Sequence, residues 1–290
     1  MYSLSHWKER GNYLTYRGQR IFYLEEGSGQ PLVLIHGFPT SSWDWNKIWP
    51  ALTERYRCIA FDMIGFGFSD KPVNHPYSLF DQTDLHEVLL DKLGITQTHV
   101  LSHDYGDTVA QEWMARQQDG NERVSLLSVA MLNGGIIYGV HHARFMQKLL
   151  NSPLGRFVGP LMSQRTFNKS FPPIFGPNTQ PTAEELDAYW SGIAFNRGQR
   201  VLYKIIRYLR ERKRHYDRWV SVLASPPVPL IFINGPEDPV SGRDMAEAFL
   251  SLGPDQQCVL LEGLGHYPQM EGPEETLATY LAFRESLEGN

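Results

Sequence analysis

An aspartate, Asp104, occupies the middle of a short segment that suits a catalytic nucleophile. It follows an apolar run that begins at Thr98, and small residues, Ser102 and Gly106, stand two positions to either side of it. A helical pattern starts directly after it. A sharp turn between a strand and a helix projects its central side chain toward a substrate, and small flanking residues permit the strained backbone. The competing interpretation is an aspartate that caps the following helix.

Two further polar residues follow apolar runs much later in the chain. Asp238 lies on the loop after Leu230–Ile233, and His266 lies on the loop after Cys258–Leu261. In an open α/β sheet, residues just past the carboxyl ends of parallel strands converge on one crevice. The chain order of nucleophile, acid and histidine is a known catalytic order on such sheets. Taken singly, Asp238 suits a turn and His266 a loop, but their joint position predicts a catalytic set with Asp104.

A fourth element is the turn His36–Pro39, at the end of the third predicted strand. The main-chain N–H groups of Phe38 and Tyr105 are predicted to point at an oxyanion that develops during catalysis. The alternative is a plain Gly-Pro turn. Three residues bordering the site are expected to support these turns: His36, Pro39 and His103.

An aspartate nucleophile selects a particular chemistry. A carboxylate is ionised at neutral pH, so it can displace a leaving group from saturated carbon without prior activation by a base. The product is an ester of Asp104. His266, oriented by Asp238, would then activate water to attack the ester carbonyl, while the two amides stabilise the oxyanion. Suitable substrates are epoxides and alkyl halides, so the predicted partners are a small molecule and water.

Six short apolar runs alternate with helical periodicities along the chain, and most of them lack the alternation of a half-buried strand. The runs are Leu32–Ile35, Cys58–Phe61, His99–Leu101, Leu126–Leu132, Leu230–Ile233 and Cys258–Leu261. This pattern predicts an α/β fold with a mostly parallel, doubly wound sheet. An edge hairpin is expected before it, over Asn12–Tyr16 and Arg20–Leu24.

One stretch interrupts this rhythm between the fourth and fifth runs. From residue 138 to 216 strand signals disappear, and Pro-rich turns separate helical patterns over Ala183–Ile193 and Val201–Arg214. Such an insertion is too long for a bare loop, so we expect a helical cap over the strand ends. The predicted division is a core of residues 1–137 and 217–290 and a cap of residues 138–216.

The composition is that of an ordinary globular chain. The 290 residues are 42% hydrophobic and 20% charged, which excludes disorder as the main state. The net charge of −5 provides no field that would recruit nucleic acid or an anionic membrane, so neither is an expected partner. Two cysteines in apolar runs, Cys58 and Cys258, favour free buried thiols, and no export signal or membrane span is visible. The expected location is the cytoplasm; no metal or cofactor is predicted, and homo-oligomerisation is left open.

These motifs make the chain resemble the epoxide hydrolase and haloalkane dehalogenase branch of the α/β-hydrolase superfamily, over residues 12–287. Within that branch it most resembles the mesoderm-specific transcript protein group. The runs that carry the likeness are His36–Ser42, Gly65–Pro72, Leu101–Asp107, Asn133–Ile136 and His266–Gln269. The resemblance implies the α/β-hydrolase fold with a helical cap inserted between sheet strands.

The resemblance also separates two reactions by how the leaving group is held. Dehalogenases of this branch hold the departing halide with side-chain N–H donors at the positions that Phe38 and Tyr105 occupy here. A dehalogenase interpretation therefore requires the indole N–H of Trp190, in the cap, to take their place. Epoxide hydrolases use cap tyrosines that donate to the epoxide oxygen, and an aromatic residue before the proline of the oxyanion turn is typical of them. Tyr208, ahead of Tyr203, best matches the proton donor.

The hypothesis from the sequence is therefore an epoxide hydrolase that acts through an ester on Asp104. One alternative is a haloalkane dehalogenase with an atypical halide site, and another is a catalytically retired protein that binds a ligand or partner. A basic stretch from Arg207 to Arg218 is interpreted as a solvated face of the cap, because acidic residues accompany it.

Overall fold

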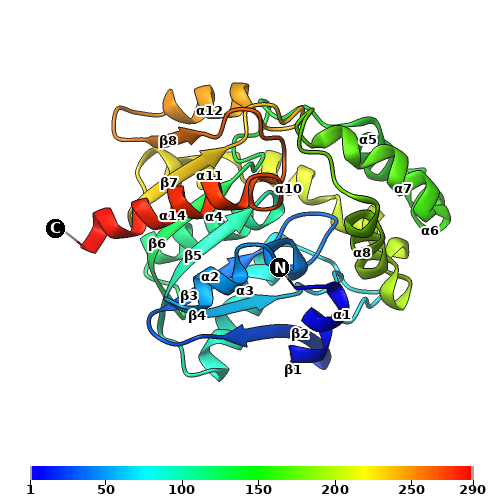
Figure 1. Cartoon of the computed structure of the whole chain (residues 1–290), viewed down its shortest axis with the longest axis horizontal. Helices are drawn as coiled ribbons and strands as arrows, with labels where there is room; N and C mark the ends of the chain where they lie inside the picture. The colour runs from blue at the N-terminus through cyan, green and yellow to red at the C-terminus, as the bar shows by residue number, and fades with distance from the viewer. Residues whose placement is uncertain (1, 289–290) are drawn as a thin grey trace.

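The computed structural model describes residues 2–288 and builds them around one eight-stranded sheet (Figure 1). The strand order is β1-β2-β4-β3-β5-β6-β7-β8. The strands are β1 Asn12–Tyr16, β2 Gln19–Glu26, β3 Pro31–Ile35, β4 Arg57–Phe61, β5 Gln97–His103, β6 Ser125–Leu132, β7 Leu230–Asn234 and β8 Gln257–Leu260. β1 and β2 form the antiparallel edge hairpin, β2 pairs antiparallel with β4, and the strands from β3 to β8 run parallel. The predicted mostly parallel sheet is confirmed.

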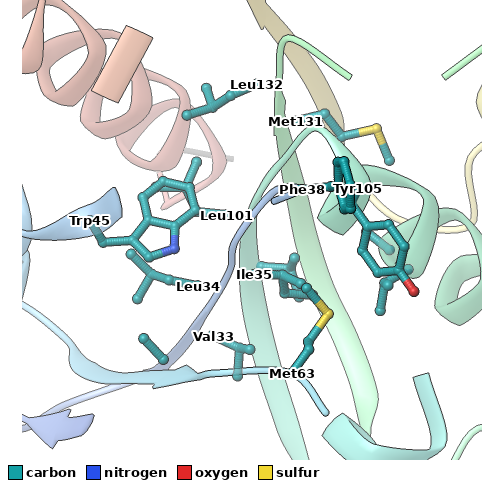
Figure 2. Close-up of a cluster of buried hydrophobic side chains, with 14 of the residues drawn as sticks. Val33, Leu34, Ile35, Phe38, Trp45, Met63, Leu101, Tyr105, Met131 and Leu132 are labelled. Carbon is teal, nitrogen blue, oxygen red and sulfur yellow. The ribbon is translucent and has the colours of Figure 1, made fainter. Parts of the chain in front are cut away.

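The apolar runs form strands because most of them are covered on both faces of the sheet. β3, β4 and β7 are buried along almost their whole length, and Figure 2 shows Val33, Leu34 and Ile35 of β3 among the buried side chains. β8 differs because it is an edge strand, in which exposed and half-buried residues alternate. Cys258 in β8 is therefore half-buried, not buried as predicted, whereas Cys58 in β4 is buried; both thiols are free.

Helices cover the sheet. α14 crosses it on the side nearest the viewer in Figure 1, and α4 packs against both α3 and α11 in a separate layer. The helices around the sheet are α1 Leu4–Arg10, the 3₁₀ helix η1 Ser42–Trp45, α2 Trp49–Thr53, α3 Leu79–Lys92, α4 Tyr105–Gln118, α11 Tyr216–Ala224, α12 Arg243–Leu250, α13 Pro268–Glu271 and α14 Pro273–Glu288. Within residues 2–288, none of the helices combines the length and apolar character that crossing a bilayer requires.

The connection between β6 and β7 is helical and extends beyond one end of the sheet, at the right of Figure 1. Its elements are α5 Phe145–Asn151, α6 Gly155–Leu161, α7 Gln164–Ser170, the 3₁₀ helix η2 Pro172–Ile174, α8 Ala183–Ala194, the 3₁₀ helix η3 Phe195–Arg200, α9 Leu202–Ile205 and α10 Tyr208–Arg214. α8 ends one residue beyond the predicted helix.

The single helix predicted over Val201–Arg214 is wrong, because the chain breaks it into α9 and α10. At the break, hydrogen bonds span three residues instead of four. The N–H of Arg207 donates to the carbonyl of Lys204, and that of Leu209 donates to the carbonyl of Ile206, each at 3.2 Å. These bonds tighten the chain into a 3₁₀ turn between the two helices.

α11 returns the chain to the helices that cover the sheet. The indole of Trp219 donates to Glu112 Oε2 of α4 at 2.9 Å, and Gln111 Nε2 donates to the carbonyl of Trp219 at 2.9 Å. The second boundary between the predicted cap, residues 138–216, and the core thus falls at the first residue of α11. The division into core and cap stays a prediction.

Candidate active site

Asp104 stands at a strained turn between β5 and α4. Its φ of 47° and ψ of −103° lie in a region that such residues rarely adopt, at a cost on the order of 1–3 kcal/mol. The turn is tight enough that a Cβ at Gly106 would lie 2.4 Å from the carbonyl oxygen of Ile35. Asp104 holds the N-cap position of α4, but its side chain makes no capping hydrogen bond. Its Oδ2 accepts a hydrogen bond from the N–H of Phe38 at 3.0 Å instead, so the geometry does not support a simple capping role.

The loops after β7 and β8 place Asp238 and His266 beside Asp104. Oδ2 of Asp238 lies 2.7 Å from Nδ1 of His266, and Nε2 of His266 lies 4.0 Å from Oδ2 of Asp104. All three side chains are buried. Because the Asp238 carboxylate engages Nδ1, Nε2 is the ring nitrogen that faces Asp104. The structure therefore brings the three residues together as acid, histidine and carboxylate.

The electrostatics of this group follow from burial and from the two carboxylates. Burial by itself lowers the pKa of His266, but the charge and hydrogen bond of Asp238, together with the charge of Asp104, raise it to about 9. Burial opposes the ionised form of Asp238, yet the charge of His266 and several hydrogen bonds lower the pKa of that carboxyl. The free site thus favours an imidazolium between two carboxylates.

Asn133, at the end of β6, holds the loop that carries Asp238. Its Nδ2 donates to Asp238 Oδ2 at 3.1 Å and to the carbonyl of Gly235 at 3.0 Å, and its Oδ1 accepts from the N–H of Gly235 at 2.7 Å. The hydroxyl of Ser241 also donates to Asp238 Oδ2, at 2.7 Å. The sequence analysis did not assign Asn133 a role, although its place just past a predicted parallel strand was a usable signal.

The turn after β3 supplies the first expected oxyanion donor. The N–H of Phe38 already points at Asp104, and Figure 2 shows the Phe38 and Tyr105 side chains close together in the buried cluster. Tyr105 is the first residue of α4, a position whose N–H has no acceptor within the helix. The N–H of Phe38 is therefore placed where the hypothesis requires it, and the role of the Tyr105 N–H stays a prediction.

The two neighbouring histidines and Pro39 frame this turn. Nε2 of His36 accepts from the N–H of Met63 at 3.1 Å, so its Nδ1 donates to the carbonyl of Gly37 at 2.8 Å. Nε2 of His103 donates to the carbonyl of His266 at 2.7 Å. Burial lowers the pKa of His36 to about 4 and that of His103 to about 3, which keeps both rings neutral. They hold turns and carry no charge.

A largely apolar cavity adjoins the site. His266, Phe38, Pro39 and Val240 line it from the core, residues of the β6–β7 connection supply the rest of its lining, and Asp104 and Tyr208 are not among the lining residues. The apolar wall residues from these helices include Leu150, Met162, Phe167 and Phe171. A mostly apolar cavity with a few converging polar groups is typical of a site for a small organic molecule.

The predicted cap side chains divide into one that reaches the site and two that do not. Tyr208 is buried, and its ring centroid lies 4.9 Å from that of Tyr105 and 6.0 Å from that of Phe38. Burial, with the charge of Asp104, raises the pKa of Tyr208. The other two expected residues, Tyr203 and Trp190, contact Arg207 and Phe167, and within the described residues neither contacts the catalytic group.

The structure adds Arg212, which the sequence analysis placed on a solvated face. This part of the interpretation is wrong, because the Arg212 side chain is buried. Its guanidinium donates to the main-chain carbonyl of Asp104 at 3.0 Å and to the hydroxyl of Thr108 at 2.8 Å. It lies 4.5 Å from the ring of Tyr208 and 4.0 Å from Asp104 Oδ1. The signal was available, since Arg212 follows Tyr208 by four residues and shares its helix face.

Comparisons with known proteins agree with this architecture. A family model described as alpha/beta hydrolase fold matches residues 30–273. The mesoderm-specific transcript homolog protein of Homo sapiens is 42% identical over 297 residues, which cover 98% of this chain and 89% of that protein. The haloalkane dehalogenase DbeA from Bradyrhizobium elkani USDA94 has a TM-score of 0.80 at 21% identity, covering 96% of this chain and 98% of that one. The epoxide hydrolase CorEH has a TM-score of 0.77 at 21% identity, covering 96% and 99%. The relative confirms the predicted resemblance, and the two structures show the shared fold.

Proposed function

The chain belongs to the alpha/beta hydrolase fold family, and we propose that it is an epoxide hydrolase that acts through a covalent ester on Asp104. The observation that carries the proposal is one buried site in which the Asp104 carboxylate meets His266, Asp238 and the N–H of Phe38. A serine nucleophile is disfavoured. The Ser102 hydroxyl donates to Asp107 Oδ1 at 2.6 Å, and no hydrogen bond joins it to His266 among the described residues.

In the first half-reaction, an oxygen of the Asp104 carboxylate attacks one carbon of the epoxide ring. The ring C–O bond breaks, and its electron pair leaves with the oxygen, which takes a proton from the phenol of Tyr208. The raised pKa of Tyr208 keeps that phenol protonated at neutral pH, so it can serve as a donor. Its hydroxyl has no hydrogen-bond partner within residues 2–288, which leaves the proton free for a substrate.

In the second half-reaction, water attacks the ester carbonyl carbon while Nε2 of His266 takes a proton from that water. The oxyanion is stabilised by the N–H groups of Phe38 and Tyr105. Collapse of the tetrahedral intermediate breaks the carbonyl carbon–oxygen bond to the product, and the hydroxyl proton of the intermediate passes to the departing alkoxide oxygen, which releases a diol and returns Asp104 to its carboxylate. The proton that His266 took from water regenerates the imidazolium of the free site.

Ester formation also changes the basicity of His266. The charge of Asp104 is one of the contributions that raise the pKa of His266 to about 9 in the free site. Esterification makes Asp104 neutral, so the pKa of His266 falls. The imidazolium then gives up its proton, which restores the phenol of Tyr208, and the neutral imidazole is available as a base. The free site thus offers the Asp104 carboxylate for alkylation, and His266 can act as a base in hydrolysis only after the ester has formed.

An epoxide is favoured over an alkyl halide by the groups near Asp104. The dehalogenases that the chain resembles hold the halide with side-chain N–H donors at two positions, and the residues at those positions here, Phe38 and Tyr105, carry no side-chain N–H. The indole of Trp190 packs near Phe167 and makes no hydrogen bond within the described part of the chain. A phenol beside the carboxylate suits the oxygen of an opening epoxide ring. We place the activity in the cytoplasm, where free thiols such as Cys58 persist.

The experiment that tests the proposal is a trap of the ester. We expect His266→Gln to accumulate Asp104 alkylated by an epoxide, detected by mass spectrometry as the mass of the intact epoxide added to the Asp104 peptide. Asp104→Asn in the same background should show no increment. Adducts from a haloalkane panel alone would establish dehalogenation instead, and no adduct from either panel, in variants that remain folded, would favour a ligand-binding protein.

A second variant tests Tyr208 as the proton donor without removing its packing contacts. Tyr208→Phe retains the ring contacts but removes the phenolic proton. We expect slower alkylation by epoxides, by about tenfold to a thousandfold, with an unchanged melting temperature. Unchanged alkylation would assign the ring-opening proton to another group.

A further inference from the structure

Helix α6 presents its apolar side chains outward. Leu154 precedes the helix, and Phe157 and Leu161 follow at three and seven residues, which places all three on one side. Their exposed fractions are 58%, 57% and 80%. An amphipathic helix of a globular protein ordinarily turns such residues toward the core. Here the arrangement is reversed.

The reversal is set by two buried glycines of α6, Gly155 and Gly159. A Cβ at Gly155 would come 1.9 Å from the carbonyl oxygen of Leu150, and one at Gly159 would lie 3.1 Å from the carbonyl oxygen of Gln199. Backbone therefore packs directly against backbone on the inner side of α6. A Cβ at Gly155 would overlap backbone and one at Gly159 would be crowded, so rotating the helix to bury its larger side chains would disrupt this close packing.

The neighbouring helix α5, which contacts α6, begins with Phe145, whose exposed fraction is 76%. We call Phe145, Leu154, Phe157 and Leu161 the outer cap surface. These residues make up four of the nine large hydrophobic side chains that are exposed in residues 2–288. They fall within one short stretch of chain at the outer edge of the cap (Figure 1). Gathered apolar exposure of this kind marks an interaction site more often than chance.

The segment that carries the outer cap surface is basic, although Asp187 of α8 reaches α7, where it accepts a hydrogen bond from Gln164 Nε2 at 2.6 Å. No Asp or Glu occurs between Glu122 and Glu184. Helices α5, α6 and α7, with the N-cap residue of α5, carry five exposed basic residues: Arg144, Lys148, Arg156, Arg165 and Lys169. None of the five forms an ion pair with any residue that the structure describes. The net charge of −5 for the whole chain conceals this local excess of positive charge.

The exposed apolar side chains and the nearby cations argue against a second copy of the chain as the binding partner of the outer cap surface. A second copy of the chain, paired through the same surface about a twofold axis, would bring the five cations of each copy close together. The interface of an anionic bilayer supplies apolar depth for Phe157 and Leu161 and phosphate charge for the cations. We propose that the outer cap surface docks the protein on membranes that contain anionic lipids, a partner that the net charge alone does not predict.

One residue of the outer cap surface, Phe145, also lines a groove next to the cavity of the candidate site. A groove on the outside of α5 is walled by Phe145 and Lys148, and it shares Arg144, Met146 and Ser170 with the cavity over His266. An apolar substrate dissolved in the bilayer could therefore enter the cavity from the docked face. This last consequence rests on the proposed function, whereas docking itself does not.

The test is co-sedimentation of the full chain with vesicles in the absence of substrate. We expect binding to phosphatidylcholine vesicles that contain phosphatidylglycerol, little binding to phosphatidylcholine alone, and weakening as salt shortens the screening length. Two double variants separate the contributions: Phe157→Ser with Leu161→Ser, and Arg156→Glu with Arg165→Glu. Each should weaken binding by at least about tenfold.

Matched controls lie outside the cap. Leu250→Ser removes a side chain that is 47% exposed on α12, and Arg55→Glu reverses an exposed cation of the core. Both should bind vesicles like the unmodified chain. The proposal is overturned if the unmodified chain does not bind anionic vesicles at low salt, if the cap variants bind as the controls do, or if light scattering shows a dimer that the cap variants dissociate. All these variants should retain epoxide turnover in solution, so loss of docking and loss of catalysis are distinguishable.

Discussion

Replacing Arg212 with methionine removes a cation that ties α10 to the turn at Asp104. The guanidinium donates to the carbonyl of Asp104 and to the hydroxyl of Thr108, at 3.0 and 2.8 Å. Methionine fills a similar volume and keeps an apolar contact with the ring of Tyr208. The substitution therefore tests the hydrogen bonds and the charge with little change in packing.

The magnitude follows from these contacts. Hydrogen bonds from a charged donor contribute about 1.5–3 kcal/mol each, and part of that is offset because methionine does not have to be stripped of water. We expect the free energy of unfolding to fall by about 3 kcal/mol, or about 5 °C in melting temperature. The Asp104 carboxylate, 4.0 Å from the guanidinium, also loses its alignment. Ester formation should slow by about tenfold, which corresponds to about 1.4 kcal/mol.

Thermal unfolding followed by circular dichroism measures the first effect, and single-turnover alkylation in the His266→Gln background measures the second. Arg214→Met, two residues away and exposed, is the matched control and should change neither. Arg212→Lys keeps the charge but loses the forked geometry of the guanidinium. Its melting temperature and alkylation rate should therefore lie between those of Arg212→Met and Arg214→Met. If Arg212→Met melts and reacts like Arg214→Met, Arg212 does not position Asp104 and the reasoning fails.

Three further outcomes can be checked on the same protein. Because the folded-state pKa of His266 is raised to about 9, the unfolding free energy should decline as pH rises from about 6.5 to 9, and His266→Gln should flatten that decline. An equal decline in both proteins would contradict the pairing of His266 with the Asp238 and Asp104 carboxylates. Gly37→Ala puts a Cβ 3.0 Å from the Cβ of Asp104, so it should slow alkylation and lower the free energy of unfolding by about 1–3 kcal/mol. Unchanged single-turnover rates would show that the turn at Gly37 does not pack closely against Asp104. Asn133→Ala removes three hydrogen bonds around Asp238 and should slow hydrolysis of the ester more than its formation, whereas equal slowing of both steps in stopped-flow measurements would argue against a role through His266.

The strands and the cluster of Asp104, Asp238 and His266 were predictable because strong local signals specify them. Runs covered on both faces of a parallel sheet are continuously apolar, and polar residues just past such runs must meet at one edge. Asp104, Asp238 and His266 satisfy this rule without any knowledge of side-chain packing. The edge strand β8 is the exception, since its exposure depends on the absence of a further neighbour in the sheet.

The cap was predictable only in outline, because tertiary packing determines which face of each helix is buried. Arg212 lies in a run of basic residues whose composition indicates solvent, yet its spacing from Tyr208 turns it toward Asp104. Helix α6 shows the opposite case, in which glycine contacts force Phe157 outward. Hydrophobicity alone would place Arg212 in solvent and Phe157 in the core, and both assignments are wrong.

A single turnover in water enriched in oxygen-18, with enzyme in excess over epoxide, tests ester formation on Asp104 most directly. The account predicts that the label enters the Asp104 carboxylate, detected in its peptide, and that the first diol released carries none. Label in the diol with an unlabelled Asp104 would mean that water attacks the epoxide itself, and it would contradict the nucleophilic role of Asp104.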